Sequence, residues 1–65
     1  MDWQETLDFY AQDILNGAPM SGDDYERKLR ERVNDSLSDR EDYTFVGVSG
    51  AEIDAAIASY REMYF

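Results

Sequence analysis

The stretch from Asp2 to Asn16, with the sequence DWQETLDFYAQDILN, decides the fold of this 65-residue chain. Its apolar side chains recur at spacings of three and four residues, which places them on one face of an α-helix. These positions are Trp3, Leu7, Tyr10, Ala11, Ile14 and Leu15. Asn16-Gly17 is a typical C-terminal helix signal, and Pro19 follows just beyond it. The pattern therefore predicts an amphipathic helix over Asp2 to Asn16.

A second helix is predicted to begin at Ser21, which together with Asp24 resembles a capping box. Its apolar stripe is thin, because only every fourth residue contributes: Tyr25, Leu29, Val33 and Leu37. The same helix contains three i,i+4 pairs with the acid first, each worth roughly 0.2–0.5 kcal/mol. These pairs are Asp23–Arg27, Asp24–Lys28 and Glu26–Arg30. The sequence leaves the end of this helix open, because residues 34–42 are rich in Asn, Asp and Ser, which favour turns.

Residues 43–48, with the sequence YTFVGV, are β-branched and aromatic, which favours an extended segment. A solitary strand leaves its backbone groups unpaired, so three arrangements remain open. The segment is a short connector, pairs with residues near Leu37, or pairs with another chain. A third helix follows, since Ser49 and Glu52 form a capping box with Val48 and Ile53 at the hydrophobic-staple positions. We therefore expect one mainly α domain over residues 1–65, a small three-helix domain with one short extended segment between helices 2 and 3.

The composition excludes several classes of protein. Without Cys or His the chain lacks the usual metal ligands, nucleophile and general base. A domain of this size also has little interior for a substrate pocket, so we expect neither an enzyme nor a cofactor or metal. The net charge of -9 is repelled by nucleic acid phosphates and by anionic membranes, so neither is an expected partner. The chain has no long apolar stretch and no signal-peptide pattern, which predicts a cytoplasmic protein.

The charges are unevenly distributed along the chain. Four of the six basic residues lie between Arg27 and Arg32, a hexapeptide of charge +3, which leaves -12 on the remaining residues. Because these basic residues follow acids at i−4 spacing, we interpret them as internal support for the second helix. Only Arg40 and Arg61 interrupt the acidic character elsewhere.

The outer face of the first helix and the turn after the second are the predicted partner-binding residues. Successive carboxylates of the first helix are spaced by about 4.5, 4.5 and 7.5 Å, which is similar to the spacing of phosphates. Two interpretations remain open: the acids imitate nucleic acid charge, or they keep a small protein in solution. The predicted residues are Asp2, Glu5, Asp8, Phe9, Asp13, Asp35, Asp39, Glu41 and Asp42.

Two aromatic features are ambiguous in the sequence. Phe9 lies in the middle of the polar face of the first helix, where it is either covered by a loop or the 43–48 segment, or exposed as an interface anchor. The C-terminal residues Met63, Tyr64 and Phe65 either end the core face of the third helix or form an exposed apolar terminus.

In size, acidity, lack of cysteine and helical character, the chain resembles phage-encoded DNA-mimic inhibitors, particularly anti-CRISPR proteins. These inhibitors share no diagnostic motif, so the resemblance transfers no residue assignments. It implies a non-enzymatic inhibitor in the host cell cytoplasm whose partner is a basic nucleic-acid-binding protein, such as a subunit of a CRISPR effector complex. Such an inhibitor binds the Lys/Arg-lined channel so that target DNA does not load.

A second hypothesis is an antitoxin-like or regulatory interaction module. Such a module docks through an amphipathic helix or through the 43–48 segment as an edge strand. We expect either a monomer or a weak homodimer, and a homodimer would close its thin core through Tyr25 and Tyr64.

Overall fold

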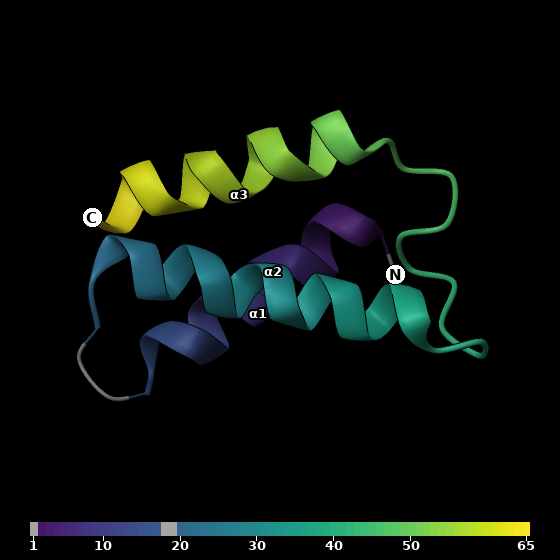
Figure 1. Cartoon of the computed structure of the whole chain (residues 1–65), viewed down its shortest axis with the longest axis horizontal. Coiled ribbons are helices and arrows are strands. Elements are labelled where there is room, and N and C mark those ends of the chain that lie inside the picture. Colours follow the sequence, from purple (N-terminus) through teal and green to yellow (C-terminus); the bar gives the residue numbers. More distant parts are fainter. Residues whose placement is uncertain (1, 18–19) are drawn as a thin grey trace.

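The computed structural model describes residues 2–17 and 20–65, and these form three helices that run in alternating directions (Figure 1). The helices are α1 (Trp3–Leu15), α2 (Gly22–Ser38) and α3 (Gly50–Tyr64). Helix α2 packs against both α1 and α3. The radius of gyration is 11.4 Å and the principal extents are 32 × 21 × 18 Å. The predicted mainly α, three-helix fold is confirmed.

Each helix begins at a side-chain cap. Asp2 Oδ1 accepts the backbone N–H of Gln4 at 3.4 Å at the start of α1. Ser21 Oγ accepts the N–H of Asp24, and Ser49 Oγ accepts the N–H of Glu52, both at 3.1 Å. The two predicted serine caps are therefore confirmed, and they fix where α2 and α3 start. Helix α1 ends at Leu15 with the predicted Asn16 as its C-cap, whereas Pro19 lies outside the described residues.

The core lies between the three helices and also receives one side chain from the loop that joins α2 to α3. Phe45 of this loop is 1% exposed, and its ring lies 6.3 Å from that of Trp3 and 6.4 Å from that of Tyr10. The buried hydrophobic residues are Leu7, Ala11, Ile14, Tyr25, Leu29, Val33, Phe45, Ile53 and Ile57. Phe45 thus closes the end of the bundle at which α1 starts.

The predicted stripe of α2 is wrong at its last residue. Leu37 is 50% exposed, and Ser36 is buried in its place. Four residues turn an α-helix by about 400°, so a stripe with a strict spacing of four drifts by about 40° at each step. The drift carries Leu37 off the core face defined by Tyr25, whereas Ser36 falls back onto it.

The expectation of an extended segment over residues 43–48 is also wrong. The backbone N–H of Val46 bonds to the carbonyl of Tyr43, and the N–H of Val48 bonds to that of Phe45, so the segment forms successive turns. Gly47 has a φ of 82°, a conformation that glycine adopts without strain. The described residues contain no neighbouring strand, so the backbone polar groups pair locally instead.

The C-terminal residues pack partly on the core. The rings of Tyr64 and Phe65 lie 6.2 and 5.1 Å from the ring of Tyr25, whereas Met63 is 65% exposed. Tyr25 itself is fully buried within one chain. No surface of the Tyr25 ring is therefore left for a second copy, whereas Tyr64, the other residue of the expected homodimer contact, is 37% exposed.

Candidate functional site

The arginines of α2 and α3 connect helices to one another. Arg30 pairs with Asp54 of α3 at 2.5 Å, and Arg32 pairs with Asp13 of α1 at 3.0 Å. The guanidinium of Arg32 also lies 4.7 Å from the centre of the Tyr10 ring. Four of the six basic residues are therefore engaged in ion pairs: Arg27, Arg30, Arg32 and Arg61.

Only one of the three predicted i,i+4 pairs forms. Glu26 pairs with Arg30 at 3.2 Å as predicted, and it also accepts Arg61 of α3 at 2.7 Å. These two arginines, with Arg61 the stronger influence, hold the pKa of Glu26 below its ordinary value. Asp23 pairs with Arg61 rather than Arg27.

The other two predicted pairs are replaced by different partners. Asp24 pairs with Arg27 at i,i+3 spacing, which lowers the pKa of Asp24. Lys28 forms no ion pair within residues 2–17 and 20–65. A tertiary partner therefore replaces the local i,i+4 pair at Asp23, because α3 brings Arg61 beside the first turns of α2.

The predicted residues of α1 have different surroundings. Asp2 and Glu5 are exposed at the start of the helix, and Phe9 is 64% exposed, so neither a loop nor the 43–48 segment covers its ring. Asp8 is exposed and accepts a hydrogen bond from the Tyr60 hydroxyl at 3.3 Å. Asp13 is the exception, because its charge is paired with Arg32.

The predicted acids after α2 also divide into two kinds. Asp35, Asp39 and Glu41 are exposed and form no ion pair in the described part of the chain. Asp42 is half-buried and accepts the hydroxyl of Ser36 at 2.6 Å and both the hydroxyl and the N–H of Thr44, at 2.6 and 3.0 Å. These hydrogen bonds, that of Ser36 first, hold the pKa of Asp42 below its ordinary value. Asp42 therefore braces the loop that carries Phe45.

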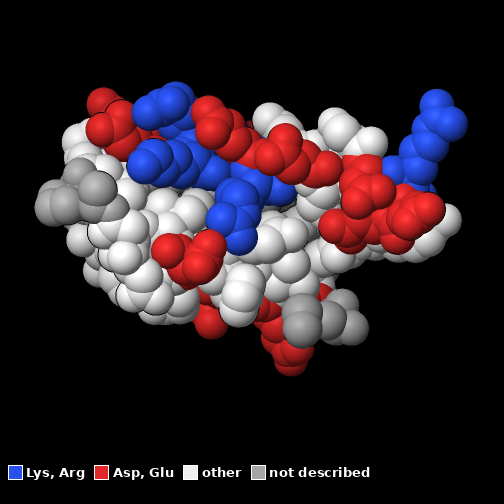
Figure 2. All heavy atoms as spheres, turned by 90° about the horizontal axis from the view of Figure 1, so that it is seen from below, with Lys and Arg blue, Asp and Glu red and all other residues white. Residues whose placement is uncertain are grey.

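The fold brings most of the free carboxylates to one end of the bundle. The start of α1, the end of α2 and the start of α3 all lie on the same side of Figure 1. Figure 2 shows acidic side chains crowded at the end where α2 finishes, with one basic side chain projecting beside them, whereas the other basic side chains in this view lie beside acids further from that end. We call this surface the acidic end, and its residues are Asp2, Glu5, Asp35, Asp39, Glu41 and Glu52.

Glu52 is the member of the acidic end that the sequence does not mark as a binding residue. It is exposed in the first turn of α3, and the sequence marked it only as a capping residue. Nothing local distinguishes a capping acid from a binding acid, because its neighbours at the acidic end come from other helices. Asp13 lies near the far end of α1 and is not brought together with the others.

Two of these acids stand where they oppose the helix dipole. Asp35 lies in the last turn of α2 and Asp39 is its C-cap, and that turn contains no basic residue. An acid at the negative end of a helix costs roughly 0.3–1 kcal/mol at low ionic strength. Their position therefore contributes nothing to the stability of α2.

The described surface presents carboxylates without ion pairs and exposed apolar side chains. No group of three or more potential ligands among the described residues is arranged to hold a metal ion. None of the helices described is both long and apolar enough to cross a membrane.

Comparisons with known proteins found no matching family model, no similar curated protein and no similar solved structure.

Proposed function

We propose that this chain is a non-enzymatic inhibitor that imitates nucleic acid charge and blocks the DNA-binding groove of a target protein. The target class that its size, acidity and helical character favour is a CRISPR effector complex, so that the chain acts as an anti-CRISPR protein. The observation that carries the proposal is the set of carboxylates that form no ion pair at the acidic end, where Arg40 is the single arginine, while the other four arginines are engaged in ion pairs elsewhere in the described residues.

The number of carboxylates without an ion pair, counted over all faces of the chain, is similar to the charge on one side of a DNA segment of the same length. Duplex DNA carries one charge per about 1.7 Å of axis, so 32 Å holds roughly 19 charges, of which about half face one side. Nine of the 15 carboxylates form no ion pair in the described part of the chain. They are Asp2, Glu5, Asp8, Asp35, Asp39, Glu41, Asp42, Glu52 and Glu62.

Asp35 and Asp39 lower the stability of α2 because they lie at the negative end of its dipole, and this also supports a role for them in binding. Solubility requires only net charge, which other surface positions supply without opposing a helix dipole. Unpaired acids beside an exposed apolar side chain combine fast electrostatic association with slow dissociation. Phe9, beside Glu5 on the outer face of α1, supplies such an apolar side chain.

Competition with DNA tests the proposal directly. Purified CRISPR effector complexes of several types are mixed with a fluorescently labelled target duplex, and DNA binding is followed by fluorescence anisotropy as the inhibitor is added. We expect displacement of the duplex from at least one complex, weakening sharply between about 50 and 500 mM salt because exposed charge pairs are screened. Displacement from none of the complexes contradicts the proposed target class, and an affinity independent of salt contradicts charge mimicry.

A matched pair of variants separates the acidic end from net charge. Glu41→Lys and Glu62→Lys change the net charge equally, and both residues are exposed, but only Glu41 lies at the acidic end. We expect Glu41→Lys to weaken displacement much more than Glu62→Lys. Equal weakening contradicts a role for the acidic end as a defined surface.

A further inference from the structure

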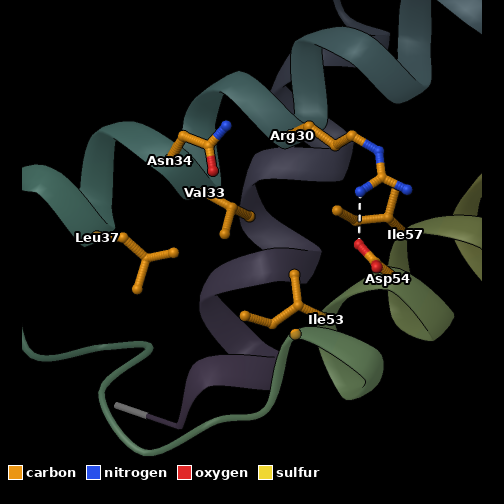
Figure 3. Close-up of a pocket in the computed structure, with 8 residues that line it drawn as sticks. Arg30, Val33, Asn34, Leu37, Ile53, Asp54 and Ile57 are labelled. Atoms are coloured by element: carbon orange, nitrogen blue, oxygen red, sulfur yellow. Dashed lines mark hydrogen bonds and ion pairs between the residues drawn. The ribbon is translucent and has the colours of Figure 1, made fainter.

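A hollow of about 150 Å³ lies between α2 and α3 (Figure 3). Its floor is apolar, because Val33, Ile53 and Ile57 line it. The ion pair between Arg30 and Asp54 spans the two helices at the end away from Leu37 (Figure 3). The remaining lining residues are Asn34, Leu37 and Gly50. We call this hollow the α2–α3 groove.

The walls of the groove have the geometry of a receptor for a helix. Helix α2 contributes residues 30, 33, 34 and 37, and α3 contributes residues 50, 53, 54 and 57. Both sets follow the i, i+3, i+4, i+7 pattern of one helix face, so the groove is about 10 Å long, or two helical turns. An amphipathic helix lays its apolar residues into grooves of this kind.

The open end of the groove leaves apolar surface in water. Leu37 forms one wall there and is 50% exposed, and a Cβ added at Gly50 would meet no atom within 4 Å beyond its own chain neighbours and helix backbone. An apolar cavity of about 150 Å³ is large enough to hold a benzene ring. The groove therefore has room for one aromatic or branched aliphatic side chain.

The net charge of the chain selects the occupant of the groove. Arg30 and Asn34 also line an adjoining charged hollow, whose three acids, Asp23, Glu26 and Glu31, are each paired with an arginine, so the hollow has no local excess of positive charge. The whole chain carries -9, so a second copy is repelled and a basic segment is attracted. We infer that the α2–α3 groove binds one apolar side chain of a basic amphipathic helix of the partner. The inference rests on the proposed function, because the occupant belongs to the same basic partner.

A peptide probe tests the groove independently of any target. The probe is a helical peptide of Lys and Ala with one central Phe, and its control carries Ala in place of Phe. Binding is followed by shifts of the backbone amide NMR signals of the chain. We expect the Phe peptide to shift Asn34, Leu37, Gly50 and Ile53, and to bind about tenfold or more tightly than the Ala peptide. Equal affinities, or shifts confined to the acidic end, overturn the inference.

Two variants alter the groove without changing the net charge. Leu37→Gln removes the apolar wall, and Gly50→Leu fills the open end. The control is Met63→Gln, which alters an exposed apolar residue outside the groove lining. We expect each groove variant to weaken binding of the Phe peptide about three- to tenfold and the control to leave it unchanged. Unchanged binding in both groove variants overturns the inference.

The same variants separate the groove from the proposed function. If Leu37→Gln leaves dissociation from an effector complex unchanged while Glu41→Lys abolishes DNA displacement, the groove fails and charge mimicry stands. If no effector complex releases DNA but the Phe peptide binds the groove, charge mimicry fails and the groove stands. Concentration-dependent dimers in sedimentation that Leu37→Gln abolishes would assign the groove to a second copy and overturn the inference.

Discussion

The Tyr25 hydroxyl donates a hydrogen bond to the carbonyl oxygen of Ala11 at 3.2 Å, which joins α2 to α1 inside the core. Both residues are fully buried, and the rings of Tyr64 and Phe65 close over Tyr25 from the end of α3. One side chain therefore contacts all three helices. Removal of the Tyr25 hydroxyl and its ionisation are therefore both expected to change the free energy of unfolding.

Removal of that hydroxyl is expected to destabilise the fold modestly. Tyr25→Phe keeps the ring contacts but loses the hydrogen bond to Ala11, which is worth about 0.5–1.5 kcal/mol. Urea denaturation followed by circular dichroism measures the change in the free energy of unfolding. An unchanged free energy would show that the hydrogen bond contributes nothing net.

Alkaline pH is expected to unfold the chain through the same residue. Burial raises the pKa of Tyr25 to about 12, above the ordinary value of 10.0 that it has in the unfolded chain. A raised pKa contributes stability that is fully present below pH 10 and is lost as pH rises towards 12, by about 2–3 kcal/mol in all. Burial also raises the pKa of Tyr60, which acts in the same direction. Denaturation midpoints measured from pH 8 to pH 12 check this, and Tyr25→Phe is expected to flatten the decline.

Phe45 and Val46 are adjacent, but truncation to alanine is expected to lower the stability of the fold much more at Phe45 than at Val46. Phe45 is 1% exposed and Val46 is 65% exposed. Phe45→Ala is expected to cost about 3–5 kcal/mol, which is most of the stability of so small a domain. Val46→Ala is expected to change stability by less than about 0.5 kcal/mol. Thermal denaturation distinguishes the two, and similar values for both would contradict the role of Phe45 as the anchor of the loop.

The loop after α2 is expected to loosen in acid. Hydrogen bonds from Ser36 and Thr44 depress the pKa of Asp42 below its unfolded value of 3.8. The stability that they supply is therefore present above about pH 4 and is lost as pH falls through the depressed pKa of the folded state. Amide hydrogen exchange of residues 42–46 between pH 2.5 and 5 measures the loosening. Asp42→Asn is expected to weaken this pH dependence, and the same profile in wild type and variant would contradict the assignment.

Phe9 is expected to matter for binding but not for folding. Its ring is 64% exposed, so Phe9→Ala should leave the melting temperature within about 2 °C of the wild type. If it is the apolar anchor of the interface, the dissociation rate from a target should rise about tenfold or more. Surface plasmon resonance separates this effect from the association rate, which the carboxylates control. A faster dissociation for Glu41→Lys but not for Phe9→Ala would exclude the anchor.

The helices and their caps were predictable because they depend on neighbours in sequence. Ser21 and Ser49 bond to backbone groups three residues away, so their roles follow from local order alone, whereas Asp2, which the prediction includes in the first helix, caps α1. The apolar face of α1 was predicted for the same reason, and all its buried residues lie on it. The exposure of Leu37 and the burial of Ser36 also follow from helix geometry, once the drift of a four-residue repeat is taken into account.

The loop and the ion pairs between helices were not predictable, because they depend on residues far apart in sequence. Propensity favours a strand at residues 43–48, but a strand requires a partner, and the core instead takes Phe45 from a turn. Local spacing pairs Asp23 with Arg27, but α3 delivers Arg61 to Asp23 at 2.7 Å. Contacts of this kind are decided by how the helices pack.

The sequence by itself therefore determined three amphipathic helices, their starting residues and an excess of negative charge, because hydrogen bonds and periodicity within a helix are local. Only the tertiary structure decided which carboxylates remain without an ion pair. It brought acids of α1 and α3 to arginines of α2, and it brought Arg61 of α3 to Glu26 of α2. It also brought Glu5, Asp39 and Glu52 to one end of the bundle, since the alternating directions of three helices place those distant residues together.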